Sequence, residues 1–102
     1  MWAQLQKVIT TPEKEPELLD VFEQLQAIEQ AESGLLRTLV MRSQADPSVV
    51  YVLVLFDSEE AARAREADPR RQQGLEHIRA SMRSVLDGPP EFFDLEVVLD
   101  RA

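Results

Sequence analysis

The chain has 102 residues and carries 11 lysines and arginines against 19 aspartates and glutamates, a formal net charge of -8. This acidic balance argues against nucleic acid as the main partner and against attachment to a membrane surface through basic residues, because both need a dense positive surface. There is no cysteine and a single histidine, His77, so disulfides, thiolate metal sites, cysteine nucleophiles and multi-histidine metal sites are excluded within one chain, and no metal is expected.

The first half of the chain predicts a strand, a helix and a second strand. Residues 4–10 predict a short strand. From Pro16 to about Ala31, apolar residues recur at spacings of three and four, which is typical of an amphipathic helix. Gly34 follows as a residue suited to the left-handed conformation that closes a helix, and residues 35–44 predict the second strand. Alternation along this strand places two sets of residues on opposite faces: Leu35, Arg37, Leu39 and Met41 on one, and Leu36, Thr38, Val40 and Arg42 on the other.

The second half predicts a third strand, two helical pieces and a last strand. Residues 49–56 are all apolar, rich in β-branched and aromatic side chains and too short for an isolated helix, so they predict a strand. This strand follows the second one closely enough to form an antiparallel hairpin with it. A helix then runs to about Ala67, where Pro69 interrupts it, and a second piece covers about residues 70–86. Residues 92–99 predict the last strand.

This order of elements is that of the ferredoxin-like βαββαβ arrangement, an α+β fold. Right-handed crossovers then place both helical regions on one face of a four-stranded antiparallel sheet. We expect residues 1–102 to form a single domain. The start of the chain lacks an apolar leader, and no stretch approaches the roughly 20 apolar residues that span a bilayer, so a cytoplasmic protein without membrane contact is expected.

The second face of this sheet needs a cover. The strand over residues 49–56 is apolar on both of its faces, with Val49, Tyr51, Leu53 and Leu55 on one and Val50, Val52, Val54 and Phe56 on the other. Exposing three or four such side chains to water costs on the order of 5–10 kcal/mol, which is comparable to the whole stability of a small domain. No spare segment is long enough to cover them. We therefore expect a homodimer that pairs the sheet faces of two chains about a two-fold axis.

Three segments carry a resemblance to a known family: residues 35–42 (LLRTLVMR), residues 51–61 (YVLVLFDSEEA) and residues 93–99 (FDLEVVL). Together they resemble the antibiotic biosynthesis monooxygenase-like (ABM) family of dimeric α+β barrel proteins. The second segment, a strand that ends in an aromatic residue before a capped helix, is the most distinctive. The resemblance implies two sheets packed face to face across a two-fold axis, and a pocket between sheet and helices that holds an aromatic polyketide or haem.

The same resemblance assigns positions to the family's site residues. Catalytic members often use an asparagine in the first strand and a tryptophan in the second helical region, and haem-degrading members add a histidine there. This chain has no asparagine: the asparagine slot falls on Gln6, the tryptophan slot on Arg65 and the haem-ligand slot on Leu75. His77 lies two positions further, about 200° around a helix, and should face elsewhere. No cofactor is therefore expected.

Three polar residues, Gln6, Arg65 and His77, are the candidate catalytic residues, and Trp2 and Phe56 are the candidate walls of the ligand pocket. The amide of Gln6 can hold a carbonyl or peroxide oxygen, and Arg65 can clamp an anionic ligand. His77 is the only side chain whose ordinary pKa falls near neutral pH. Each also has a purely structural interpretation: an ordinary strand glutamine, an ion-paired arginine, a partly exposed helix histidine, and core aromatics.

Charge is unevenly distributed, with acidic residues around the first helix and basic residues around the second helical region. This separation predicts neighbouring helices whose opposite charges lie side by side, and an anion-binding patch is the alternative. The acidic group comprises Glu13, Glu15, Glu17, Asp20, Glu23, Glu29 and Glu32, and the basic group Arg63, Arg65, Arg70, Arg71, Arg79 and Arg83.

Two functional hypotheses follow. The first is a small-ligand protein of the ABM type that oxygenates an electron-rich aromatic substrate without a cofactor, the substrate supplying the electrons and the protein a dry pocket. The second is a non-catalytic dimeric module that binds a small molecule or another protein. The missing asparagine and tryptophan favour the second hypothesis, and the fold by itself supports either.

Overall fold

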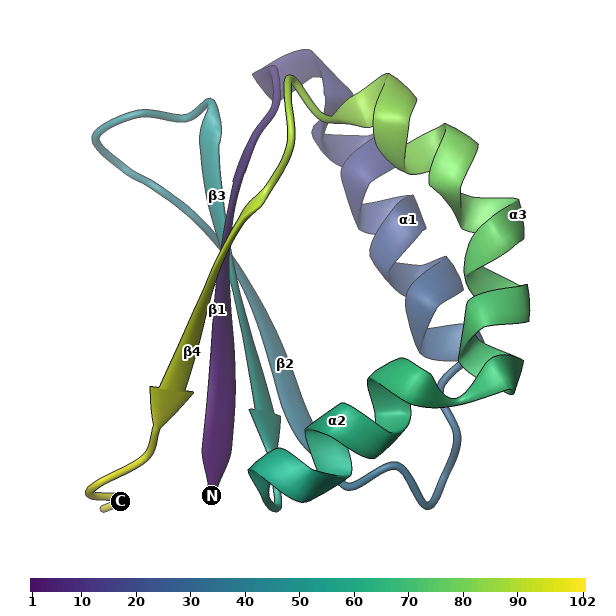
Figure 1. The fold of residues 1–102 in the computed structure, drawn as a ribbon. Coiled ribbons are helices and arrows are strands. Elements are labelled where there is room, and N and C mark those ends of the chain that lie inside the picture. Colours follow the sequence, from purple (N-terminus) through teal and green to yellow (C-terminus); the bar gives the residue numbers. More distant parts are fainter.

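The computed structural model describes all of residues 1–102 and contains one antiparallel sheet with every helix on the same face (Figure 1). The sheet order is β2-β3-β1-β4, so the two central strands are the third and the first along the chain. This is the predicted ferredoxin-like α+β fold, with the second helical region divided in two. The elements are β1 (Trp2–Ile9), the 3-10 turn η1 (Pro12–Lys14), α1 (Glu15–Ala27), β2 (Leu35–Arg42), β3 (Val49–Phe56), α2 (Glu59–Ala67), α3 (Pro69–Val85) and β4 (Glu91–Glu96).

Four predicted boundaries are wrong. Strand β1 begins at Trp2 and not at Gln4, and β2 ends at Arg42 and not at residue 44. Helix α1 ends at Ala27 and not near Ala31, because residues 28–33 form a turn closed by backbone hydrogen bonds from the amide of Glu29 to the carbonyl of Gln26 and from Ser33 to Gln30. Strand β4 ends at Glu96 and not at residue 99, because its neighbour β1 begins at Trp2, the partner of Glu96. One more backbone hydrogen bond follows, from the amide of Val97 to the carbonyl of Met1 at 3.2 Å, and the pairing ends there.

Gly34 has the left-handed conformation that the sequence predicts, with φ of 81°, but it precedes β2 and does not close α1. A Cβ at this position would lie 2.7 Å from the Cβ of Ala61. The amide of Asp57 also donates to the carbonyl of Gly34 at 2.9 Å. Glycine is therefore required here because the turn after α1 packs directly against the first turn of α2.

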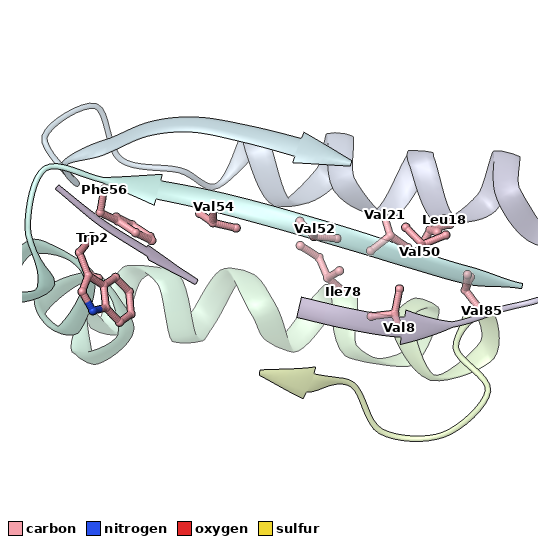
Figure 2. Packing of buried hydrophobic residues seen from close by; sticks show 11 residues of the cluster. Trp2, Val8, Leu18, Val21, Val50, Val52, Val54, Phe56, Ile78 and Val85 are labelled. Carbon is pink, nitrogen blue, oxygen red and sulfur yellow. The ribbon is translucent and has the colours of Figure 1, made fainter. Parts of the chain in front are cut away.

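The core lies between the helices and the inner face of the sheet, which is the face the helices cover (Figure 2). Alternate residues of β3, from Val50 to Phe56, are buried there against Trp2 and Val8 of β1. The helices contribute Leu18, Val21, Ala62, Ile78 and Val85 to the same cluster. Because side chains alternate along a strand, this packing fixes which residues of each strand face the helices.

The predicted alternation is wrong at the start of β2. The pairing between β2 and β3 shifts between Leu35 and Arg37, so that Leu35 lies opposite Phe56 and Arg37 opposite Leu55. Leu35 therefore faces the helices together with Val40, against the core. The bulge falls at Leu36, which is 50% exposed.

No helix covers the outer face of the sheet (Figure 1). Four apolar residues form a row across it, since Leu39 and Leu5 both pair with Leu53, and Leu5 also pairs with Phe93. Phe93, Leu95 and Met41 are each more than 40% exposed, at 44%, 42% and 41%. This outer row and its neighbours are the apolar surface for which the sequence predicts a partner chain. None of the helices is both long and apolar enough to cross a membrane.

Candidate functional site

A cavity of about 1230 Å³ lies between the inner face of the sheet and the helices. Its polar lining includes residues of β1, of the two edge strands β2 and β4, and of all three helices, such as Gln6, Arg65 and Asp94. Its apolar lining comprises Phe22, Leu25, Leu35, Val40, Val52, Val54, Leu75 and Met82, among others. A second hollow of about 550 Å³, at the end of α3 and the turn after it, contains none of the predicted site residues.

Gln6 lies in the middle of β1, between Val52 of β3 and Phe92 of β4, and lines the cavity. Its neighbour Gln4 is held in place, since Gln4 Nε2 donates to Asp94 Oδ1 at 3.2 Å. The side chain of Gln6 makes no such hydrogen bond with the rest of the chain. Its amide is therefore free to donate to or accept from a molecule in the cavity.

Arg65 also lines the cavity, but its guanidinium is already engaged by Glu29. Arg65 Nε lies 3.1 Å and 2.9 Å from the two carboxylate oxygens of Glu29, and Nη2 lies 2.7 Å from Oε1. The guanidinium carbon also lies 5.2 Å from the centre of the Phe56 ring. The two side chains are only 16% and 14% exposed. Arg65 therefore acts first as one half of a nearly buried, bidentate ion pair.

The pKa of Glu29 lies below its ordinary value of 4.5. Burial is the largest single influence and disfavours the charged form, but hydrogen bonds from Arg65 and Ser33 and the charges of Arg65 and Arg71 together outweigh it. Glu29 is thus an ionised structural carboxylate at neutral pH. It is unsuited to act as a general base there.

Trp2 and Phe56 are buried side by side, with ring centres 6.0 Å apart and planes at 49°. Neither ring lines the cavity directly. They lie beneath two arginines that do, since the Arg63 guanidinium carbon lies 5.0 Å from the centre of the Trp2 ring and Arg65 covers Phe56. Arg63 is fixed in addition by Asp94, at 2.8 Å. The structure thus places the two aromatics behind the arginines and not on the wall itself.

His77 lies on the exposed side of α3 and does not line the cavity, whereas Leu75 does. The structure therefore brings Gln6 and Arg65 to one cavity and leaves His77 outside it. These residues do not fit haem, because the position for its ligand is a leucine and the one histidine faces away. No group of three or more His, Cys, Asp or Glu side chains is placed to hold a metal ion.

Arg71 is a cavity residue that the sequence predicts only as a member of the basic group. It lies in the first turn of α3 and lines the cavity beside Leu75. Burial, and then the charge of Arg65, lower the pKa of Arg71 from its ordinary value, while Glu29 and Glu66 act in the opposite direction. The sequence does carry a signal for it, since Arg71 is four residues before Leu75 and seven before Ile78, on the apolar stripe of that helix.

The predicted pairing of opposite charges between the helical regions is confirmed. Besides the pair of Arg65 with Glu29, Arg70 Nη2 lies 2.7 Å from Glu32 Oε1. Both glutamates belong to the turn after α1, and both arginines to the second helical region. This turn is therefore tied to α2 and α3 by charge as well as by the close contact at Gly34.

Comparison with known proteins agrees with this architecture. Residues 1–77 match the sequence profile of the family described as Antibiotic biosynthesis monooxygenase. No curated protein sequence matches the chain. Among solved structures, a Caulobacter crescentus protein assigned as an antibiotic biosynthesis monooxygenase superposes with a TM-score of 0.75 at 24% identity, over 96% of this chain and 90% of that one.

A second solved structure is that of a point mutant of SnoaB from Streptomyces nogalater, described as a cofactor-independent oxygenase. It superposes with a TM-score of 0.73 at 15% identity, over 97% of this chain and 94% of that one. A third protein, from Nitrosomonas europaea, superposes with a TM-score of 0.71 at 13% identity, over 97% of this chain and 100% of that one. At these identities the likeness is one of fold.

Proposed function

Because the chain belongs to the antibiotic biosynthesis monooxygenase family, we propose that it binds a small aromatic molecule in the cavity between sheet and helices and oxygenates it without a cofactor. The observation that carries this proposal is the unengaged amide of Gln6 inside a cavity that also has an apolar wall. The likeness to a cofactor-independent oxygenase adds support at the level of the fold.

The cavity suits a reaction in which the substrate itself reduces oxygen. An electron-rich aromatic donates electrons to O2, one oxygen atom enters the substrate and the other leaves as water. Negative charge develops on oxygen along this path, and Gln6 Nε2 is placed to donate a hydrogen bond to it. Walls such as Val52, Val54 and Leu75 keep water away from that charge and so strengthen the hydrogen bond.

We further propose that two chains pair through the outer face of the sheet. An apolar row of Leu39, Leu53, Leu5 and Phe93 crosses all four strands. Monomeric proteins rarely leave a continuous apolar surface exposed to water. Val98 and Leu99, 89% and 68% exposed, follow β4 at the edge of the same sheet. A second copy supplies an apolar surface of matching shape by symmetry.

The alternative function is ligand binding without catalysis. It is favoured by the engagement of Arg65 with Glu29, and by the position of His77, which leaves the cavity without a histidine to act as acid or base. Both functions require the same cavity and differ in whether oxygen is consumed.

Oxygen consumption with a panel of small aromatic hydroquinones tests the proposal. We expect uptake by the wild-type protein above that of buffer, and a fall in kcat of about 10²-fold in Gln6→Ala, the size seen when one oxyanion donor is removed. Gln73→Ala is the matched control, because Gln73 is an exposed glutamine of α3 outside the cavity. Binding of the hydroquinones with no uptake would replace the proposal by the non-catalytic alternative.

A further inference from the structure

Most charged groups of the cavity are paired with one another. Arg37 and Glu23 make no ion pair but are exposed, whereas Arg71 is unpaired and partly buried. Arg65 takes both carboxylate oxygens of Glu29, and Arg63 binds Asp94 and approaches Glu66 at 3.5 Å. Arg71 has no carboxylate within ion-pairing distance, although Glu29 and Glu66 are near enough to influence it. The carboxylates that could neutralise Arg71 are thus already engaged by the other two arginines.

The position of Arg71 makes its lack of a partner unfavourable for the folded chain. Its Nη1 is shielded from solvent and has no hydrogen-bond partner within the chain. A shielded charged donor without a partner is strongly unfavourable, and proteins rarely keep one that nothing satisfies. Arg71 also projects from the apolar stripe of α3, so its guanidinium borders the wall that Leu75 continues. An anionic group on an apolar molecule would therefore meet both at once.

We propose that Arg71 binds the acidic group of the ligand, and that the ligand is an aromatic carboxylate whose ring lies along the apolar wall. A guanidinium presents parallel N–H donors that match the two oxygens of a carboxylate. The neighbouring Arg65–Glu29 pair contributes no net charge, and Arg71 is the partly buried arginine of the cavity that has no counter-ion of its own. This inference rests on the proposed aromatic cavity and specifies the chemical class that fills it.

Calorimetric titration with a matched pair of probes tests this inference. 2-Naphthoate and 2-naphthamide share ring and shape and differ in charge. We expect wild-type protein to bind 2-naphthoate about tenfold more tightly or better, which is the preference that one charge-assisted hydrogen bond supplies. In Arg71→Gln the preference should disappear while binding of 2-naphthamide persists.

Arg70→Gln is the control, because Arg70 is the adjacent arginine but is exposed and outside the cavity. It carries the same change of charge and should keep the preference for 2-naphthoate. Equal binding of the two probes to wild type would contradict carboxylate binding by Arg71, but not the binding of an aromatic molecule in the cavity. Failure of both probes to bind would count against the aromatic cavity itself, and against this inference with it.

Thermal unfolding supplies a readout that does not need a ligand. If the chain holds no partner for Arg71, Arg71→Met should leave Tm unchanged or raise it, because a shielded charge is replaced by an apolar side chain of similar length. Loss of the naphthoate preference in a variant of undiminished stability would support the proposal. A clear fall in Tm would mean that the chain itself satisfies Arg71, and the inference would fail.

Discussion

Glu29→Gln is expected to lower the free energy of unfolding by about 3 kcal/mol at pH 7, the lower end of the range for breaking a buried ion pair. The substitution leaves Arg65 in a nearly buried position without its counter-charge, and it removes a carboxylate whose charge acts on Arg71 as well. Urea unfolding measures the loss. The slight exposure of both partners, 16% and 14%, is the reason for choosing the lower end.

The control is Glu32→Gln, three residues further along the same turn. Glu32 pairs with Arg70 at the same distance, 2.7 Å, but the two side chains are 65% and 55% exposed. An exposed pair contributes at most about 1 kcal/mol, so this variant should change little. Equal losses in the two variants would contradict the claim that burial makes the Arg65–Glu29 pair important.

The effect of Glu29→Gln should also depend on pH in a definite direction. Because the pKa of Glu29 is lower in the folded chain than its ordinary value of 4.5, its contribution to stability is complete above that value. The contribution is lost as the pH falls through the lowered pKa, where the protonated acid becomes equivalent to glutamine. The difference between wild type and Glu29→Gln should therefore shrink in urea titrations below pH 4.5. A constant difference down to pH 2 or so would contradict the assignment.

Leu53→Asp is expected to dissociate the proposed dimer. Leu53 is at the centre of the outer row, paired with Leu39 on one side and Leu5 on the other. In a two-fold dimer the substitution would bring two carboxylates into the interface, and burying each without a partner weakens association by more than about 100-fold. Sedimentation velocity at micromolar concentration should show wild-type dimers and Leu53→Asp monomers.

Leu19→Asp provides the comparison, since Leu19 is an apolar residue of α1 that is 47% exposed on the helical side. It introduces the same charge away from the outer face and should leave the dimer intact. A folded wild-type monomer at these concentrations would remove the proposed pairing, and the cavity on the other side of the sheet would be unaffected by that result.

The sequence was sufficient for the fold because its strongest patterns are local. The uninterrupted apolar run of residues 49–56 matches β3 from its first residue to its last, and the break before Pro69 separates α2 from α3. The end of α1 could not be found in this way, since Ile28 and Ala31 continue the helical pattern. There the turn that leads back to the sheet takes precedence over local helix preference.

The site was less predictable because it depends on contacts between distant residues. The family resemblance implied that Gln6 and Arg65 belong to the site, whereas the engagement of Arg65 by Glu29 joins residues 36 apart. Arg71 differs from its neighbour Arg70 only in helical phase. Its place on the apolar stripe of α3 can be read from the sequence. The lack of a carboxylate within ion-pairing distance depends on how the whole chain folds.

The proposed function and the role of Arg71 both require an aromatic molecule to enter the inner cavity. Nuclear Overhauser effects from bound 2-naphthoate to methyl groups of β3 test this most directly. Successive residues of that strand face opposite sides of the sheet, so the strand contains its own control. We predict contacts from the naphthoate ring to Val52 and Val54, which line the cavity. Contacts to Leu53 and Leu55 in their place, or none at all, would contradict the account.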